Sequence, residues 1–112
     1  MQNNAPQHDH DQDVGSDLQF TSQTKRNNAD GTWVSGTLCG HRFEALVFAG
    51  HALNPDWEIG DSRITKLWLQ RLADQEEVYN WDRGEDHPPA DKTAAAIVQF
   101  PCDGLAEATY GE

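Results

Sequence analysis

Hydrophobic and polar residues alternate along four short segments of the chain, and this period of two predicts β-strands. A short turn containing Gly40 joins the first two segments, and a polar tetrapeptide joins the last two, so each pair predicts a hairpin. The two hairpins together predict a four-stranded antiparallel sheet. The expected strands are Thr32–Leu38, Arg42–Ala49, Arg63–Leu72 and Glu77–Asp82.

After Asp91 the apolar residues recur every three or four positions, as in an amphipathic helix. Asp91 is a suitable N-cap, and Gly111 is a suitable C-terminal stop. Pro101 lacks the N–H that would bond to residue 97, so we expect either a kink or two shorter helices meeting near residues 100–104. The sequence therefore predicts an α+β domain in which a C-terminal helix packs on one face of the four-stranded antiparallel sheet.

The first 29 residues differ in composition from the rest of the chain. Their six apolar residues are too few to offset the entropy lost when a segment of this length becomes ordered. We therefore expect a disordered polar and acidic tail over residues 1–29 and a single domain over residues 30–112. The apolar residues of the tail are Met1, Ala5, Val14, Leu18, Phe20 and Ala29.

The segment His51–Ser62 lies between the two predicted hairpins and is a loop by composition. It holds two turn-forming sequences, Asn54-Pro55-Asp56 and Gly60-Asp61-Ser62. It also holds Trp57 and Ile59, and apolar side chains in a loop of this length indicate that the loop packs onto the domain.

The 112-residue chain has 19 Asp and Glu residues against 8 Lys and Arg residues, so its formal net charge is −11. Nucleic acids and anionic membranes attract clustered Lys and Arg, so this charge argues against direct binding to either of them. It permits a basic partner protein or the imitation of a polyanion. The sequence has no apolar run of about 18 residues and no signal-peptide pattern at its start, so we expect a cytoplasmic protein.

Aromatic side chains are frequent in the second predicted hairpin. Strict alternation places Lys66 and Trp68 on one face of the third strand, and Tyr79 and Trp81 on one face of the fourth. If these are the same face of the sheet, and the helix covers the other, the four side chains form an exposed patch that binds a protein partner. Alternatively, the loop between the hairpins covers this patch with its two apolar side chains.

Ionisable residues are concentrated directly after the fourth predicted strand. Carboxylates and a histidine bind a divalent cation or transfer a proton only if they converge within a few ångströms. The competing interpretation is a structural turn in which Arg83 pairs with a local carboxylate and Gly84 adopts a positive φ. The candidate residues are Asp82, Arg83, Glu85, Asp86 and His87.

The sequence contains none of the common catalytic or cofactor-binding motifs. Cys39 and Cys102 form no C-x-x-C pair, and no oxyanion-stabilising motif accompanies Cys39 and its neighbours His41 and His51. The run His8–Asp11 alternates histidine with aspartate, but such a run in a disordered tail binds transition metals weakly. We therefore expect no catalytic residue, no metal site and no cofactor.

Three segments of the chain resemble a family of short bacterial proteins of unknown function. These segments are GTWVSG, EIGDSRITKLWLQ and NWDRG, and the resemblance extends roughly from Gly31 to Gly111. It implies an association with bacterial mobile genetic elements, and it implies no activity and no catalytic residue. It also implies an uninterrupted terminal helix, from which Pro101 and Gly104 depart.

These observations favour a non-enzymatic module that binds another protein through one face of its sheet or through its acidic surface. One alternative is a DNA-mimic inhibitor of a defence or nucleic-acid-binding protein, which requires a row of carboxylates at about the spacing of phosphates. A second alternative is a metal-binding protein or an enzyme that uses the loop over residues 82–87.

Overall fold

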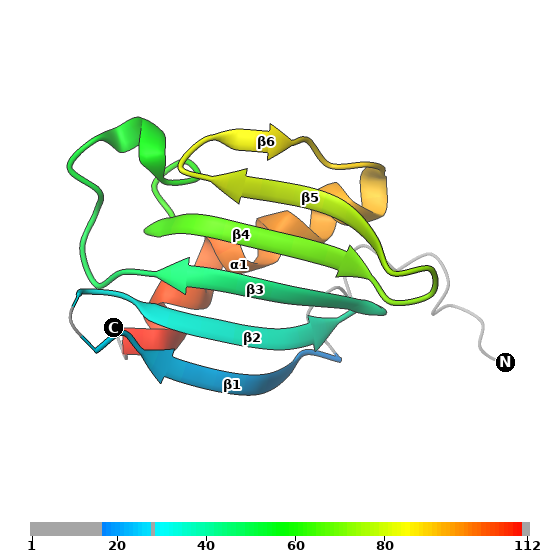
Figure 1. Ribbon diagram of the computed structural model, residues 1–112, viewed down its shortest axis with the longest axis horizontal. Coiled ribbons are helices and arrows are strands. Elements are labelled where there is room, and N and C mark those ends of the chain that lie inside the picture. The colour runs from blue at the N-terminus through cyan, green and yellow to red at the C-terminus, as the bar shows by residue number, and fades with distance from the viewer. Residues whose placement is uncertain (1–16, 28, 111–112) are drawn as a thin grey trace, which may run out of the picture.

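The computed structural model describes residues 17–27 and 29–110, and in these residues six antiparallel strands form one sheet (Figure 1). Each strand pairs with the next along the chain, so the sheet is a meander. The strands are β1 (Gln19–Lys25), β2 (Thr32–Leu38), β3 (His41–Val47), β4 (Ile64–Arg71), β5 (Glu76–Asp82) and β6 (Glu85–His87). A short 3-10 helix, η2 (Pro55–Trp57), lies between β3 and β4, and helix α1 spans Lys92–Tyr110.

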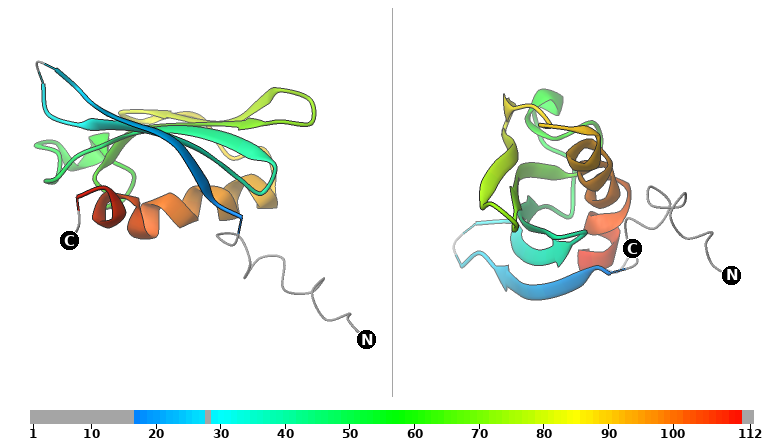
Figure 2. Two further views of the ribbon diagram at one scale, coloured as in Figure 1. Left: turned by 90° about the horizontal axis from the view of Figure 1, so that it is seen from below. Right: turned by 90° about the vertical axis from the view of Figure 1, so that its right-hand side faces the viewer.

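The α+β class and the single C-terminal helix on one face of the sheet are confirmed (Figure 2). The four predicted strands are β2 to β5, and each begins and ends within two residues of the prediction. In β2 alternate side chains are buried, as the period of two requires, and β3 follows the same pattern except that Leu46 is buried as well.

The predicted number of strands was wrong, because the sheet gains one strand at each edge. β1 comes from the segment that the composition assigned to the tail, and all seven of its residues are exposed. Backbone pairing with β2 holds it, and the Asp17 carboxylate accepts hydrogen bonds from the backbone N–H of Cys39 at 3.0 and 3.2 Å. β6 comes from the predicted acidic loop and pairs with β5. Neither edge strand has a buried stripe, so hydrophobic patterning did not find them. The predicted tail residues 1–16 lie outside the described residues.

The hydrophobic core lies between the sheet and α1. Side chains of β2 to β5 that point toward the helix are almost fully buried, among them Val34, Ala45, Leu67 and Leu69. The helix packs against β3, β4 and β5 and crosses behind the sheet diagonally (Figure 1). Its buried residues are Ala94, Ile97, Val98, Pro101, Leu105 and Ala106.

Helix α1 is a single helix of 19 residues with Pro101 inside it, so of the two predicted alternatives, a kink or two shorter helices, the second was wrong. Pro101 removes the hydrogen bond to residue 97, and its ring is buried on the face of the helix that also buries Leu105. Asp91 caps the helix as predicted, because its Oδ1 accepts a hydrogen bond from the N–H of Ala94 at 2.8 Å. At the other end, the Tyr110 hydroxyl donates to the carbonyl of Val47 at 3.0 Å and ties the helix to β3.

Candidate functional site

Trp68 and Tyr79 lie on opposite faces of the sheet, so the predicted patch that combined them was wrong. Trp68 pairs with Asn80 and Leu69 pairs with Tyr79, but the next pair is Gln70 with Glu77. The strand β5 therefore contains one extra residue, Val78, at a β-bulge. The bulge leaves Val78 and Tyr79 both buried, with exposed fractions of 0% and 2%, and burial raises the pKa of the Tyr79 hydroxyl above its usual range.

Trp81 also lies on the helix side of the sheet, opposite Leu67, and packs against the core. Its indole Nε1 donates a hydrogen bond to the carbonyl of Trp57 at 2.9 Å, which ties η2 to the end of β5. Of the four predicted patch residues, the structure keeps Lys66 and Trp68 together on the outer face and moves Tyr79 and Trp81 to the inner one.

The outer face of the sheet combines an aromatic ring with paired charges. The Arg42 guanidinium lies 5.6 Å from the centre of the Trp68 ring and bonds to Glu44 at 2.6 Å. The Trp68 Nε1 donates to Glu77 Oε1 at 3.1 Å. Lys66 Nζ lies 3.6 Å from Asp82 Oδ1. Because these polar groups surround the Trp68 ring, this part of the face is not a purely apolar patch.

The predicted acidic loop is a turn followed by β6, and its ionisable groups point to different partners. Asp82 lies near Lys66 and near Arg83, whose Nε is 3.8 Å away, and His87 Nδ1 lies 3.0 Å from Glu77. Glu85 and Asp86 are exposed in β6. Residues 17–27 and 29–110 contain no group of three or more His, Cys, Asp or Glu that could hold a metal ion.

The backbone supports the interpretation of this segment as a structural turn. Gly84 has a φ of 148° and Arg83 has a φ of 55°, both in the region that favours glycine. The Arg83 N–H donates to the carbonyl of Thr65 at 2.8 Å, and the Asp82 N–H donates to that of Gly84 at 2.9 Å. The turn therefore fixes the start of β6 against β4.

An apolar cavity of 390 Å³ lies between α1 and the inner face of the sheet. Apolar side chains from β1, β2, β3, β4 and α1 line it, and Asp103 is its one charged lining residue in the part of the chain that the structure describes. Two of its lining rings reach solvent, since Phe20 is 46% exposed and Phe100 is 37% exposed. The combination of an apolar cavity and exposed rings is typical of a binding site.

Sequence reasoning missed this cavity because it assigned Leu18 and Phe20 to the tail. Both residues line the cavity, and their spacing of two is the one signal in the sequence that could have indicated a strand there. The cavity also depends on the diagonal path of α1, which no periodicity specifies.

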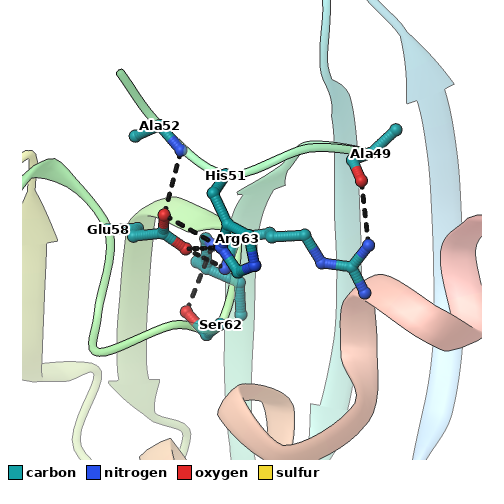
Figure 3. Close-up of polar contacts among 7 residues, drawn as sticks. Ala49, His51, Ala52, Glu58, Ser62 and Arg63 are labelled. Carbon is teal, nitrogen blue, oxygen red and sulfur yellow. Dashed lines mark hydrogen bonds and ion pairs between the residues drawn. The ribbon is translucent and has the colours of Figure 1, made fainter. Parts of the chain in front are cut away.

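The loop between β3 and β4 is organised around the buried carboxylate of Glu58, which is 3% exposed (Figure 3). This carboxylate accepts hydrogen bonds from the N–H groups of Ala52 at 2.9 Å and Arg63 at 2.5 Å, and it lies 3.1 Å from His51 Nδ1. Burial by itself raises the pKa of Glu58, but these hydrogen bonds and the charge of protonated His51 outweigh it and lower the pKa. Glu58 was not among the predicted functional residues.

The loop meets the domain differently from the prediction. Ile59 packs against the core as expected, but the Trp57 side chain is 41% exposed. Arg63, with a φ of 65°, donates from its guanidinium to the carbonyl of Ala49 at 2.9 Å and so ties the two ends of the loop together (Figure 3). The loop reaches Lys66 on the outer face but does not cover Trp68.

The cysteine and histidine residues do not form a nucleophile pair. His41 Nδ1 lies 2.7 Å from the backbone carbonyl of Cys39 rather than from its thiol. Burial raises the pKa of the Cys102 thiol to about 11, so it is protonated at neutral pH. Cys39 and Cys102 form no disulfide.

The structure thus defines a small α+β domain with a meander sheet, one covering helix and an apolar cavity beneath that helix. The chain belongs to the family described as a domain of unknown function, DUF7678, whose model matches residues 32–106. No curated protein and no solved structure shows a significant match to the chain. β1 lies outside the matched residues. No helix among the described residues is both long and apolar enough to cross a membrane.

Proposed function

We propose that this domain is a non-enzymatic interaction module that binds a protein partner in the apolar cavity between β1 and α1. The observation that carries the proposal is the cavity itself, with the exposed rings of Phe20 and Phe100. Large apolar side chains buried in such a space supply most of the binding energy of many protein interfaces. The cytoplasmic location and the link to mobile genetic elements stay predictions.

The chemistry around the cavity favours an extended partner segment that carries a large apolar side chain beside Lys or Arg. β1 is the last strand on its side of the sheet, so one edge of its backbone has no strand partner within the described residues. Such an edge accepts an added strand through backbone hydrogen bonds. The net charge of −11, with Asp103 on the cavity wall, favours basic residues next to the apolar side chain.

The outer face of the sheet supports this proposal over the DNA-mimic alternative. Three carboxylates on this face have partners, since Glu44 pairs with Arg42, Asp82 with Lys66, and Glu77 with Trp68 and His87. Imitation of a phosphate backbone needs a row of carboxylates that are available to a basic cleft. The metal or enzyme alternative has equally little support, because the residues of the loop over 82–87 do not converge.

The test is selection of random peptides displayed on phage, followed by titration of the enriched peptides against variants of the full chain. Ala108 is exposed and lines the cavity, so Ala108→Trp places a large ring in it. Ala95→Trp is the matched control, since Ala95 is exposed on the same helix and is not among the residues that line the cavity.

We expect enriched peptides to share a large apolar residue next to Lys or Arg. We expect Ala108→Trp to weaken their binding at least about tenfold, while Ala95→Trp leaves it unchanged. Equal binding to wild type and to Ala108→Trp, or a selection that enriches no peptide, would overturn the proposal.

A further inference from the structure

A second cavity, of 450 Å³, lies at the end of the sheet where η2 is found, and its lining differs from that of the apolar cavity. Leu46 of β3 and Phe48, which directly follows β3, line it, and the loop contributes Trp57. No residue lines both cavities, so the two sites are physically separate.

Cationic side chains are concentrated around this second cavity. Arg26, Lys66 and Arg83 line it, together with one carboxylate, Asp30. The chain has only 8 Lys and Arg residues against 19 Asp and Glu, so three cations beside one acid reverse the charge balance of the whole molecule.

These cations keep much of their capacity to bind an anion. Arg26 donates from Nε to the backbone carbonyl of Asp30 at 2.7 Å, which neutralises no charge, and its guanidinium lies 5.6 Å from the centre of the Phe48 ring. Lys66 and Arg83 share the single carboxylate of Asp82, at the long distances of 3.6 and 3.8 Å. The Arg83 side chain is 60% exposed.

Two of the structural elements described above hold the walls of this cavity in place. The turn after β5 keeps Arg83 in a left-handed conformation and bonds its N–H to Thr65, so the side chain starts from a fixed point. The Glu58 carboxylate holds His51 and Ala52, which also line the cavity (Figure 3). Hydrogen bonds therefore fix the backbone at these lining residues.

We propose that this cavity binds a small organic anion with a planar apolar body. Phosphate or carboxylate oxygens would accept hydrogen bonds from Arg83, Lys66 and Arg26, because a guanidinium group matches the geometry of both anions. The planar body would lie against Phe48 and the exposed ring of Trp57. The volume is within the range of about 300–1,000 Å³ that small-molecule sites have. This site goes beyond the proposed protein interaction and does not depend on it.

The test is titration of the isotopically labelled full chain, monitored by amide and indole NMR shifts, with adenosine 5′-monophosphate and 2-naphthoate as separate probes. Adenosine and inorganic phosphate, each lacking one half of the ligand chemistry, are the matched ligand controls. We expect at least one probe to saturate the site by about 10 mM. The largest shifts should occur at the Trp57 indole and at the Arg83 amide. The control ligands should bind at least about fivefold more weakly. Binding of the nucleotide alone indicates a phosphate ligand, and binding of the naphthoate alone indicates a carboxylate.

Variants test the role of the cations separately from folding. Arg83→Gln and Lys66→Gln should each weaken binding at least about fivefold, whereas Arg42→Gln, on the same face but outside the cavity, should not. Two independent variants keep the test valid if one of them fails to fold. No binding of either probe, shifts centred on Phe20 and Phe100, or binding that neither cavity variant weakens would overturn the proposal.

Discussion

The two faces of the sheet are built from the same strands but are held by different forces. On the inner face, β4 presents Leu67 and Leu69, each 1% exposed, to the helix. On the outer face, the same strand presents Lys66 and Trp68 to paired charges and solvent. The inner face is stabilised by burial of apolar surface, whereas the outer face has interactions that solvent weakens. Mutations on the two faces should therefore have very different effects on folding.

The largest difference is expected between neighbouring residues of β4. Leu67→Ala should lower the free energy of unfolding by about 2–5 kcal/mol, because it removes buried methyl groups and leaves a cavity. Lys66→Ala, one residue away on the outer face, should lower it by less than about 1 kcal/mol. Urea denaturation followed by tryptophan fluorescence measures both. Similar losses for the two variants would contradict the division between the faces.

Gly36→Ala tests whether β1 lies in close contact with β2 at the edge of the sheet. A Cβ atom at Gly36 would lie 2.5 Å from the backbone carbonyl oxygen of Gln19 and 2.9 Å from the Phe43 ring, so β1 must shift. We expect a loss of about 1–3 kcal/mol in the free energy of unfolding. Gly104→Ala is the control, since no atom lies within 4 Å of its Cβ position, and it should stabilise α1 by up to about 1 kcal/mol. A neutral Gly36→Ala would mean that β1 is loosely attached.

The parts of the fold that could be predicted from the sequence are those in which side chains repeat at a fixed spacing. β2 to β5 and α1 have a buried stripe, so alternation or helical spacing marks them. β1 has no buried stripe, and backbone hydrogen bonds to β2 hold it in the sheet instead. The extra residue Val78 changes the face to which Tyr79 points, and strict alternation has no means of locating a bulge.

The candidate sites were harder to predict because they depend on residues that meet only in the folded chain. Glu58 accepts hydrogen bonds from two N–H groups that lie six positions before it and five after it. The second cavity, of 450 Å³, combines three cationic residues from distant parts of the chain. Arg26 follows β1, Lys66 belongs to β4, and Arg83 lies in the turn between β5 and β6. Their joint position follows from the meander order of the sheet, which brings the ends of distant strands to one side of the molecule (Figure 1).

Glu58→Gln sharpens the comparison, because Glu58 is buried through hydrogen bonds rather than through apolar contacts. We expect a loss of about 1–2 kcal/mol at pH 7, since the new amide group cannot accept all three hydrogen bonds. The folded-state pKa of Glu58 is lowered, so its stabilising contribution is present above the unfolded-state pKa and is lost as the pH falls through the folded value. The gap between wild type and variant should therefore close in acid, in urea denaturation measured from pH 7 down to about pH 3. A gap that stays constant with pH would show that the charge of Glu58 does not matter.

Trp68→Ala should have only a small effect on stability, although tryptophan is the largest side chain. Its ring is only partly buried, and its contacts are with the Arg42 guanidinium and the Glu77 carboxylate. An exposed cation–π contact contributes about 0.5–1 kcal/mol, so we expect a loss near 1 kcal/mol in the free energy of unfolding. Tyr79→Ala, on the inner face of the neighbouring strand, should cost about 3–5 kcal/mol. A loss above about 2 kcal/mol for Trp68→Ala would mean that its ring is buried like the core side chains. The inner and outer faces would then not differ in how much their side chains stabilise the fold.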